Sequence, residues 1–315
     1  MPEDQELQNA KTPTRESITF ILGEDKGKDN RYYDMAEAYY RTNAKTKNDL
    51  LITNCRSLAA VMDYLQNHPT DNGRPWNEIR LIVHSNEWRG IGIPIREGGK
   101  RLDAKILKEA LDDKHLTSLK IKEIDNFTKL IVNACGLGKN EKLVNLLGEV
   151  FGNCQVNTSE FFVMYDDING TPRQYEAEYY YAFFKTGYRP ADFQLAAQFK
   201  KRYPGVNINW MDALTRKHQR YVGDTYHYFF NIPVNWVVTY PTKEERPVLK
   251  NKIDQQNWLL QQKELMAQIE KTKIPWNKFR WQFQAKDYTF ADGVTEPAII
   301  VKGKSSVLCV LQSRE

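Results

Sequence analysis

LIVHSNEWRG (81–90) and LIVNACGLG (130–138) are the two stretches that decide the fold of this chain. Each begins as an apolar run of strand length and ends abruptly at a reactive side chain, His84 in the first and Cys135 in the second. Each then continues into backbone that contains glycine. Strands that are apolar throughout are typical of a parallel sheet covered on both faces. The pair therefore predicts two neighbouring strands in the core of an α/β domain.

The segments around these strands alternate between two periodicities. SITFIL (17–22), LLITN (50–54) and EFFVMY (160–165) are short apolar runs of strand type. Between them, apolar residues at positions 58, 61, 62 and 65 have helical spacing, and EKLVNLLGEVF (141–151) has a helical pattern. This alternation predicts a three-layer α/β/α domain with a mostly parallel sheet.

Changes in composition predict three parts. Residues 1–16 are polar and mixed in charge, lack the apolar stretch of a signal peptide and are expected to form a flexible tail. Residues 17–168 hold the α/β pattern. Residues 169–315 are rich in aromatic side chains and are expected to form an α+β domain of unknown role. Its expected elements are three helical stretches up to residue 221, an edge strand around Pro233, a helix over 250–272 and a terminal β-hairpin with its loop at Asp292-Gly293.

Charge and hydropathy exclude several classes of partner. The net charge of +5 is spread over 315 residues, so no nucleic-acid partner is expected. No apolar run approaches the roughly 20 residues that span a bilayer, and we expect a cytoplasmic protein. The cysteines form no C-x-x-C pair, so free thiols, no metal site and no cofactor are expected; they are Cys55, Cys135, Cys154 and Cys309.

His84 and Cys135 end neighbouring predicted strands, where open α/β sheets bind their ligands. A cysteine peptidase needs a thiolate and an imidazole that takes the thiol proton and later protonates the leaving amine. Backbone N–H groups hold the oxyanion. The glycines after each strand leave room for a peptide to approach the backbone. The two residues are therefore candidates for a catalytic dyad.

The same residues resemble the caspase-like cysteine peptidases, a group that includes caspases, separases, gingipains and CHAT proteases. The caspase signature is Q-A-C-[RQG]-G with a histidine about 50 residues upstream; this chain has N-A-C-G, and the separation is 135 − 84 = 51. GIGIPIREGGKRLDAKILKEAL (90–111) is similar to the short hairpin and helix of CHAT domains. The resemblance covers about 150 residues and does not extend into the C-terminal half.

The resemblance implies an endopeptidase that hydrolyses protein substrates through a Cys-His dyad and an acyl-enzyme. By the same resemblance, the backbone N–H groups of Ser85 and Cys135 form the oxyanion hole. The expected substrate cleft is lined by Asn133, Gly136, Asp166 and Asp167. The chain departs from the family where Ser85 follows the histidine, a position usually held by glycine. Asn133 stands where members that prefer a basic residue often carry Asp, so a Lys/Arg preference is not supported.

Other functions stay open beside the peptidase. The alternative is a catalytically inactive caspase-like interaction module, with the C-terminal domain as the contact for a regulatory protein. GLGKN (136–140) is similar to the end of a phosphate-binding loop but lacks its first glycine and its final hydroxyl residue. Asp166-Asp167 could also be simple turn residues. His218 and His227 lack metal-ligand spacing and are expected to be structural.

Overall fold

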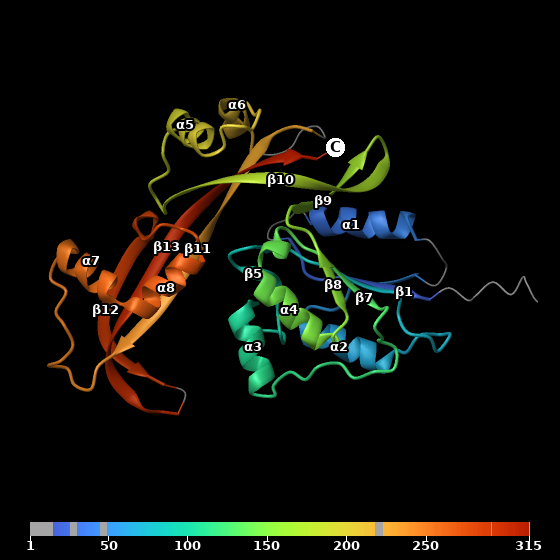
Figure 1. The fold of residues 1–315 in the computed structure, drawn as a ribbon, viewed down its shortest axis with the longest axis horizontal. Coiled ribbons are helices and arrows are strands. Elements are labelled where there is room, and N and C mark those ends of the chain that lie inside the picture. Colours follow the sequence, from blue (N-terminus) through green and yellow to red (C-terminus); the bar gives the residue numbers. More distant parts are fainter. Residues whose placement is uncertain (1–14, 26–29, 45–48, 218–222, 291, 315) are drawn as a thin grey trace, which may run out of the picture. The chain divides into compact units, whose positions relative to one another are not determined.

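A computed structural model describes residues 15–25, 30–44, 49–217, 223–290 and 292–314 (Figure 1). The chain divides into two compact units, Met1–Ala177 and Glu178–Glu315. Of the expected tail 1–16, residues 1–14 lie outside the described part. Arg15 lies within it and donates to Pro75 O at 2.9 Å and to Asp125 Oδ1 at 2.8 Å.

The first unit is built on a five-stranded sheet in the order β2-β1-β3-β7-β8. All four strand pairs are parallel. The strands are β1 (Ser17–Ile21), β2 (Asp49–Ile52), β3 (Glu78–Ile82), β7 (Lys129–Asn133) and β8 (Gln155–Thr158). The chain passes from β1 to β2 on one side and returns to β3 on the other side of β1. The order therefore reverses between β1 and β3, which is where such sheets form a ligand crevice.

Helices cover both faces of this sheet, as the sequence pattern predicted (Figure 1). One face carries α1 (Arg31–Thr42), and the other carries α2 (Leu58–Asn67), α3 (Ala104–Asp112) and α4 (Glu141–Val150). The strand residues alternate between the faces. Ile18 and Phe20 join the larger core with α2, α3 and α4, whereas Ile21 and Ile82 join the core under α1. The first unit is thus an α/β fold.

A small antiparallel sheet follows the third core strand. It consists of β4 (Ser85–Asn86), β5 (Gly90–Pro94) and β6 (Arg101–Leu102), and α3 begins directly after it with Asp103 as its N-cap. Gly90 has φ +67°, and a Cβ there would lie 2.3 Å from the carbonyl oxygen of Leu102. The hairpin expected over residues 90–111 is confirmed, and it depends on glycine at position 90.

One prediction about the end of the first unit was wrong, and one strand there was not predicted. The run 160–165 leads into β9 (Phe162–Ile168), which pairs antiparallel with β10 (Thr171–Lys185) instead of joining the parallel sheet. Asn169 and Gly170 both have positive φ, as a tight hairpin turn requires. The fifth parallel strand is β8, whose sequence QVNT lacks the apolar run that marked the others.

The second unit is a curled antiparallel sheet with helices beside it. Its strand order is β11-β13-β10, with β12 also paired to β13. The segment 175–184, expected among the helices, is strand β10. The helix expected over 250–272 is two helices, because Gln262 has φ −80° and ψ 85°. The elements are β11 (Tyr226–Thr239), β12 (Arg280–Thr289), β13 (Thr295–Ser313), α5 (Asp192–Arg202), α6 (Trp210–Thr215), α7 (Lys252–Gln261) and α8 (Lys263–Lys271), with a 3-10 turn at Trp276–Lys278. A further 3-10 turn, Leu137–Lys139, follows β7 in the first unit.

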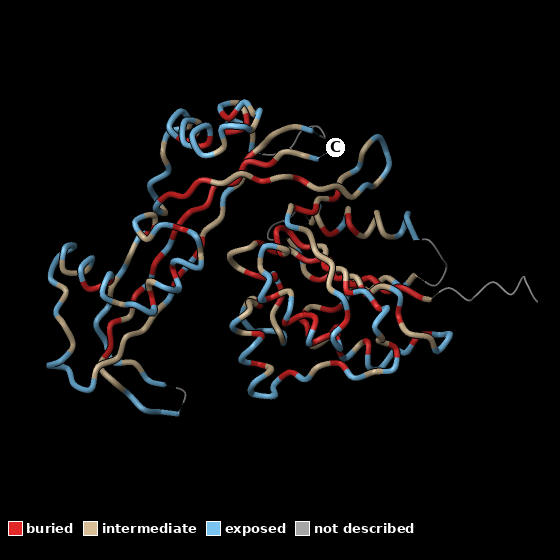
Figure 2. Tube along the Cα trace, in the orientation of Figure 1, coloured by how far each residue is buried: buried red, intermediate tan, exposed pale blue. Residues whose placement is uncertain are grey.

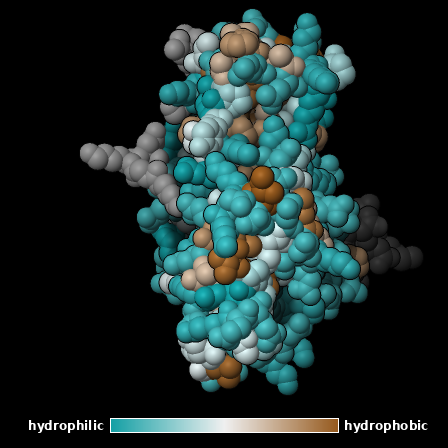
Figure 3. All heavy atoms as spheres, turned by 90° about the vertical axis from the view of Figure 1, so that its left-hand side faces the viewer, coloured by the Kyte–Doolittle hydropathy of each residue, from teal (hydrophilic) through white to brown (hydrophobic). Residues whose placement is uncertain are grey.

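Two expectations for this unit are confirmed. β11, which contains Pro233, lies at the edge of the sheet, and β12 and β13 form the terminal hairpin. Buried residues concentrate along the strands of each unit (Figure 2). The face that carries α7 and α8 is mainly hydrophilic, with small separate hydrophobic patches (Figure 3). In the described part of the chain, no helix is both long and apolar enough to cross a bilayer.

Candidate active site

The register of two neighbouring strands places His84 beside Cys135. β3 and β7 pair with a constant offset of 51 residues, ending with Ile82 opposite Asn133. His84 and Cys135 each lie two residues further along. The Val83 N–H donates to Asn133 O at 3.2 Å, so the ladder continues beyond the strand ends. Adjacent strands are about 4.8 Å apart, and the two residues therefore follow neighbouring strands at the same level.

Both side chains lie on the face of the sheet that α1 covers. The His84 ring centroid is 4.3 Å from that of Tyr32 and 4.9 Å from that of Tyr33. Burial, followed by the neighbouring Cys135, raises the pKa of Tyr32 well above its ordinary value. Opposed residues of parallel strands point to the same side of a sheet. The imidazole and the thiol thus share the two tyrosines as neighbours.

The Cys135 thiol is held in a protonated state. The residue is 9% exposed, and its Sγ donates to Val163 O of β9 at 3.6 Å. Burial raises the pKa of the thiol to about 12, although the positive charge of Arg101 acts in the opposite direction. The hydrogen bonds of the described residues do not join this thiol to the His84 ring. In this conformation the sulfur is therefore not an activated nucleophile.

The His84 ring is paired with a carboxylate that the sequence reasoning missed. His84 Nε2 is hydrogen-bonded to Asp25 Oδ1. The His84 side chain is 40% exposed and the Asp25 side chain 18%. Asp25 lies in the polar loop after β1, at the strand-order reversal. The one sequence signal for this contact is the acidic pair Glu24-Asp25 in the loop that follows an apolar strand, β1, which is the neighbour of the strand that leads to the histidine.

Arg101 fixes the backbone segment that follows His84. Its Nε donates to Arg89 O at 2.9 Å, and its Nη2 donates to Gly90 O at 2.7 Å and to His84 O at 3.4 Å. Burial, and then the charge of Arg89, lowers the pKa of the Arg101 guanidinium to about 10. These three carbonyls belong to the loop after β3. Arg101 therefore fixes the backbone on one side of the site and brings a positive charge near Cys135.

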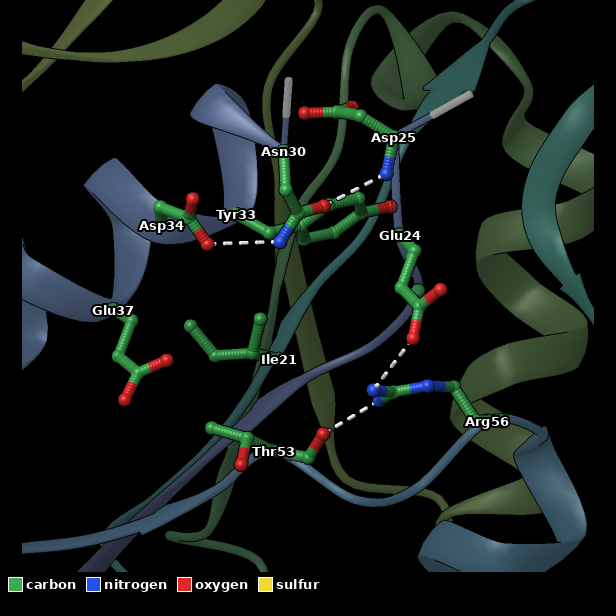
Figure 4. Close-up of a pocket in the computed structure, with 10 residues that line it drawn as sticks. Ile21, Glu24, Asp25, Asn30, Tyr33, Asp34, Glu37, Thr53 and Arg56 are labelled. Atoms are coloured by element: carbon green, nitrogen blue, oxygen red, sulfur yellow. Dashed lines mark hydrogen bonds and ion pairs between the residues drawn. The ribbon is translucent and has the colours of Figure 1, made fainter. Parts of the chain in front are cut away.

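A cavity of about 370 Å³ lies at the carboxyl ends of β1 and β2, beside the first turns of α1 (Figure 4). Tyr33, which contacts the His84 ring, is one of its walls. The Asp25 N–H donates to Asn30 Oδ1 at 2.8 Å, and Asn30 Nδ2 donates to Asp34 Oδ1 at 2.9 Å. Glu24 pairs with Arg56 at 3.3 Å. Hydrogen bonds between neighbouring side chains thus order this wall of the site.

Ser85, Asn133 and Gly136 lie around the dyad with partners of their own. The Ser85 hydroxyl donates to Cys135 O at 2.7 Å, which joins the two strand ends. Asn133 Nδ2 donates to Tyr40 Oη at 2.6 Å. The Gly136 N–H donates to Phe161 O at 2.8 Å, and Gly136 has φ +63°. The Gly136 amide is therefore engaged in a hydrogen bond to the segment that leads into β9.

The two expected cleft aspartates lie at the end of β9. Asp166 Oδ1 pairs with Arg31 at 2.5 Å, at the start of α1. Asp167 Oδ1 accepts the Gly170 N–H at 2.6 Å, which is a turn bond. Within the described chain, neither carboxylate forms a hydrogen bond to His84 or Cys135.

The remaining motifs show no further chemistry. His227 is buried, and its Nδ1 bonds to Ala213 O at 3.1 Å, while His218 lies outside the described residues. No group of three His, Cys, Asp or Glu side chains within the described ranges has metal-site geometry.

Comparisons with models of protein families, with curated proteins and with solved structures found no match to this chain.

Proposed function

We propose that residues 17–168 form a caspase-like cysteine endopeptidase domain in which His84 and Cys135 are the catalytic dyad. The observation that supports this most is the strand register. The offset of 51 residues between β3 and β7 equals the separation of His84 and Cys135, so both reach the carboxyl edge of the sheet side by side. The strand-order reversal beside β3 gives a substrate access to this edge.

In the proposed reaction, the free ring nitrogen of His84, Nδ1, takes the thiol proton of Cys135. The thiolate attacks the scissile carbonyl, and the oxyanion is held by backbone N–H groups of Cys135 and Ser85. The imidazolium then protonates the leaving amine, and a thioester remains. His84 next takes a proton from water, and the resulting hydroxide hydrolyses the thioester and frees the thiol.

This sequence of steps requires a change at the thiol first. The Sγ has to exchange its bond to Val163 O for one to His84. Because burial holds the thiol pKa near 12, the described conformation corresponds to a resting form of the proposed peptidase. A peptide that pairs with the strand ends would supply the binding free energy for the change.

The second candidate is an interaction module that keeps this fold without turnover. The observation in its favour is the same buried thiol, which is bonded to a carbonyl oxygen and carries a raised pKa. In that case the second unit would be the contact for a regulatory protein, and His84 and Cys135 would only pack the edge of the sheet.

A peptide-cleavage assay with matched variants separates the two candidates. The full chain is incubated with a positional-scanning peptide library, and products are identified by mass spectrometry. Cys135→Ala and His84→Ala are each expected to abolish cleavage while Tm stays within a few degrees of the wild type. Cys154→Ala is the matched control, because Cys154 is also a buried thiol, with a pKa raised to about 11. Absence of wild-type cleavage, or cleavage that survives both dyad variants, contradicts the peptidase.

A further inference from the structure

We propose that Asp25 is the positioning residue of His84, fixing the ring tautomer that leaves Nδ1 free to accept the thiol proton. This inference rests on the proposed function and adds a third member to its site. It is based on the contact between Asp25 Oδ1 and His84 Nε2. A carboxylate on one ring nitrogen keeps the proton there and leaves the other nitrogen as the base.

Asp25 is held in place at three points. Its Oδ1 accepts from His84, its Oδ2 accepts the N–H of Tyr32 at 3.0 Å, and its own N–H donates to Asn30 Oδ1 at 2.8 Å. Tyr32 and Asn30 belong to the start of α1, where backbone N–H groups have no partner within the helix. The carboxylate therefore has a fixed orientation, unlike a flexible surface ion pair.

The imidazole is held from the other side as well. Tyr32 and Tyr33 both contact its ring, and the His84 backbone N–H donates to Tyr33 Oη at 3.2 Å. The ring is thus confined by two aromatic side chains and one carboxylate. With Nε2 bonded to Asp25, Nδ1 is the nitrogen left for Cys135. When the ring gains the thiol proton, the same carboxylate lies against the imidazolium.

A purely structural role for Asp25 makes a different prediction. Its Oδ2 bond to the α1 N-terminus stabilises the helix, so any loss of Asp25 is expected to lower Tm. A change in kcat alone would not separate this effect from positioning. The tautomer of His84 separates the positioning role from the structural role, because capping of α1 by itself does not determine which ring nitrogen carries the proton.

The test uses the full chain with Asp25→Asn, Asp25→Glu and, as matched control, Glu37→Gln. Glu37 lines the same cavity, but its described bonds are to Arg41 and include neither the His84 ring nor Asp25 and Asn30. In Asp25→Asn the amide donates to Nε2 and moves the proton to Nδ1, the nitrogen that has to accept from the thiol. We expect kcat to fall by about 10²–10⁴-fold with KM changed less than about threefold. Asp25→Glu is expected to restore part of the loss, and Glu37→Gln to behave as the wild type.

The tautomer of His84 is measured independently of enzymatic activity, by ¹H–¹⁵N NMR of the imidazole in a Cys135→Ala background. The Nε2–H form is expected with Asp25 and the Nδ1–H form with Asp25→Asn. An unchanged tautomer, or an Asp25→Asn variant that keeps kcat within about threefold of the wild type, overturns the inference. A wild type that cleaves no peptide refutes the proposed function instead, and the NMR result then shows separately whether Asp25 sets the tautomer.

Discussion

Alkylation of Cys135 in the native protein at pH 7 is expected to be about 1000-fold slower than alkylation of an ordinary thiol. The perturbation is a short pulse of iodoacetamide, which reacts with the thiolate. Burial raises the pKa of Cys135 from an ordinary 9.0 to about 12. At pH 7 the thiolate fraction then falls from roughly 1 in 100 to roughly 1 in 100,000, since each pKa unit is tenfold.

The labelling rates of the other buried thiols in the same protein provide an internal reference for the labelling rate of Cys135. Burial raises the pKa of Cys154 to about 11, and it also raises that of Cys55 above 9.0. We therefore expect Cys135 to be labelled more slowly than Cys154. The assay digests the labelled protein and measures each cysteine peptide by mass spectrometry, with protein unfolded in guanidinium as the reference for unshifted thiols.

A Cys135 that is labelled first among the four cysteines at pH 7 would refute the reasoning from burial. It would mean that the resting thiol is already activated, as a His84 bond to sulfur would make it. Slow labelling of the resting protein together with cleavage of library peptides is the combination that the proposed resting form requires.

Four further predictions concern the candidate dyad and its surroundings. Tyr32→Phe is expected to raise the free energy of unfolding by about 1 kcal/mol, because the buried Tyr32 hydroxyl has no hydrogen-bond partner among the described residues. Tyr33→Phe is expected to lower the free energy of unfolding by about 1 kcal/mol, since the His84 N–H loses its acceptor. Urea unfolding measures both changes. Gly90→Ala is expected to cost more than about 1 kcal/mol in the same assay, because its φ is +67° and the Cβ would meet a carbonyl oxygen. Because burial raises the pKa of Cys135 from 9.0 to about 12, the contribution of this thiol to folding stability is fully present below about pH 9 and is progressively lost as the pH rises toward 12. Cys135→Ala is expected to flatten this alkaline decline, and an equally steep decline in that variant would contradict the linkage.

The sequence predicted well the strands that carry an apolar run. β1, β3 and β7 form at the runs expected from their residues: β1 is buried along its whole length, and β3 and β7 bury the apolar residues of their runs, such as Leu81 and Val132. The hairpin after His84 and the terminal hairpin were also predicted correctly, since glycine and turn residues mark them.

The missed elements are those whose pattern is set by tertiary context. β8 is a short edge strand of the parallel sheet with the sequence QVNT, so burial imposes little on its residues. β10 was expected to be helical, yet its tyrosines and phenylalanines favour strands once a partner is present. The Asn169-Gly170 turn was a usable signal for that partner, because both residues tolerate positive φ.

Part of the candidate site could be predicted from the sequence and part could not, and this difference bears on the proposed function. His84 and Cys135 could be predicted because each interrupts an apolar strand. Asp25 could not, because its contact depends on how the loop after β1 folds against α1. The burial of the thiol could not be predicted either, since the carbonyl that accepts from it belongs to β9, a strand assigned to the wrong sheet. In the proposed peptidase, the residues that place the base and those that restrain the nucleophile would therefore come from different elements, α1 with its preceding loop and the β9–β10 hairpin. Under that proposal, a substrate would release the thiol by moving β9 while Asp25 keeps the imidazole in place.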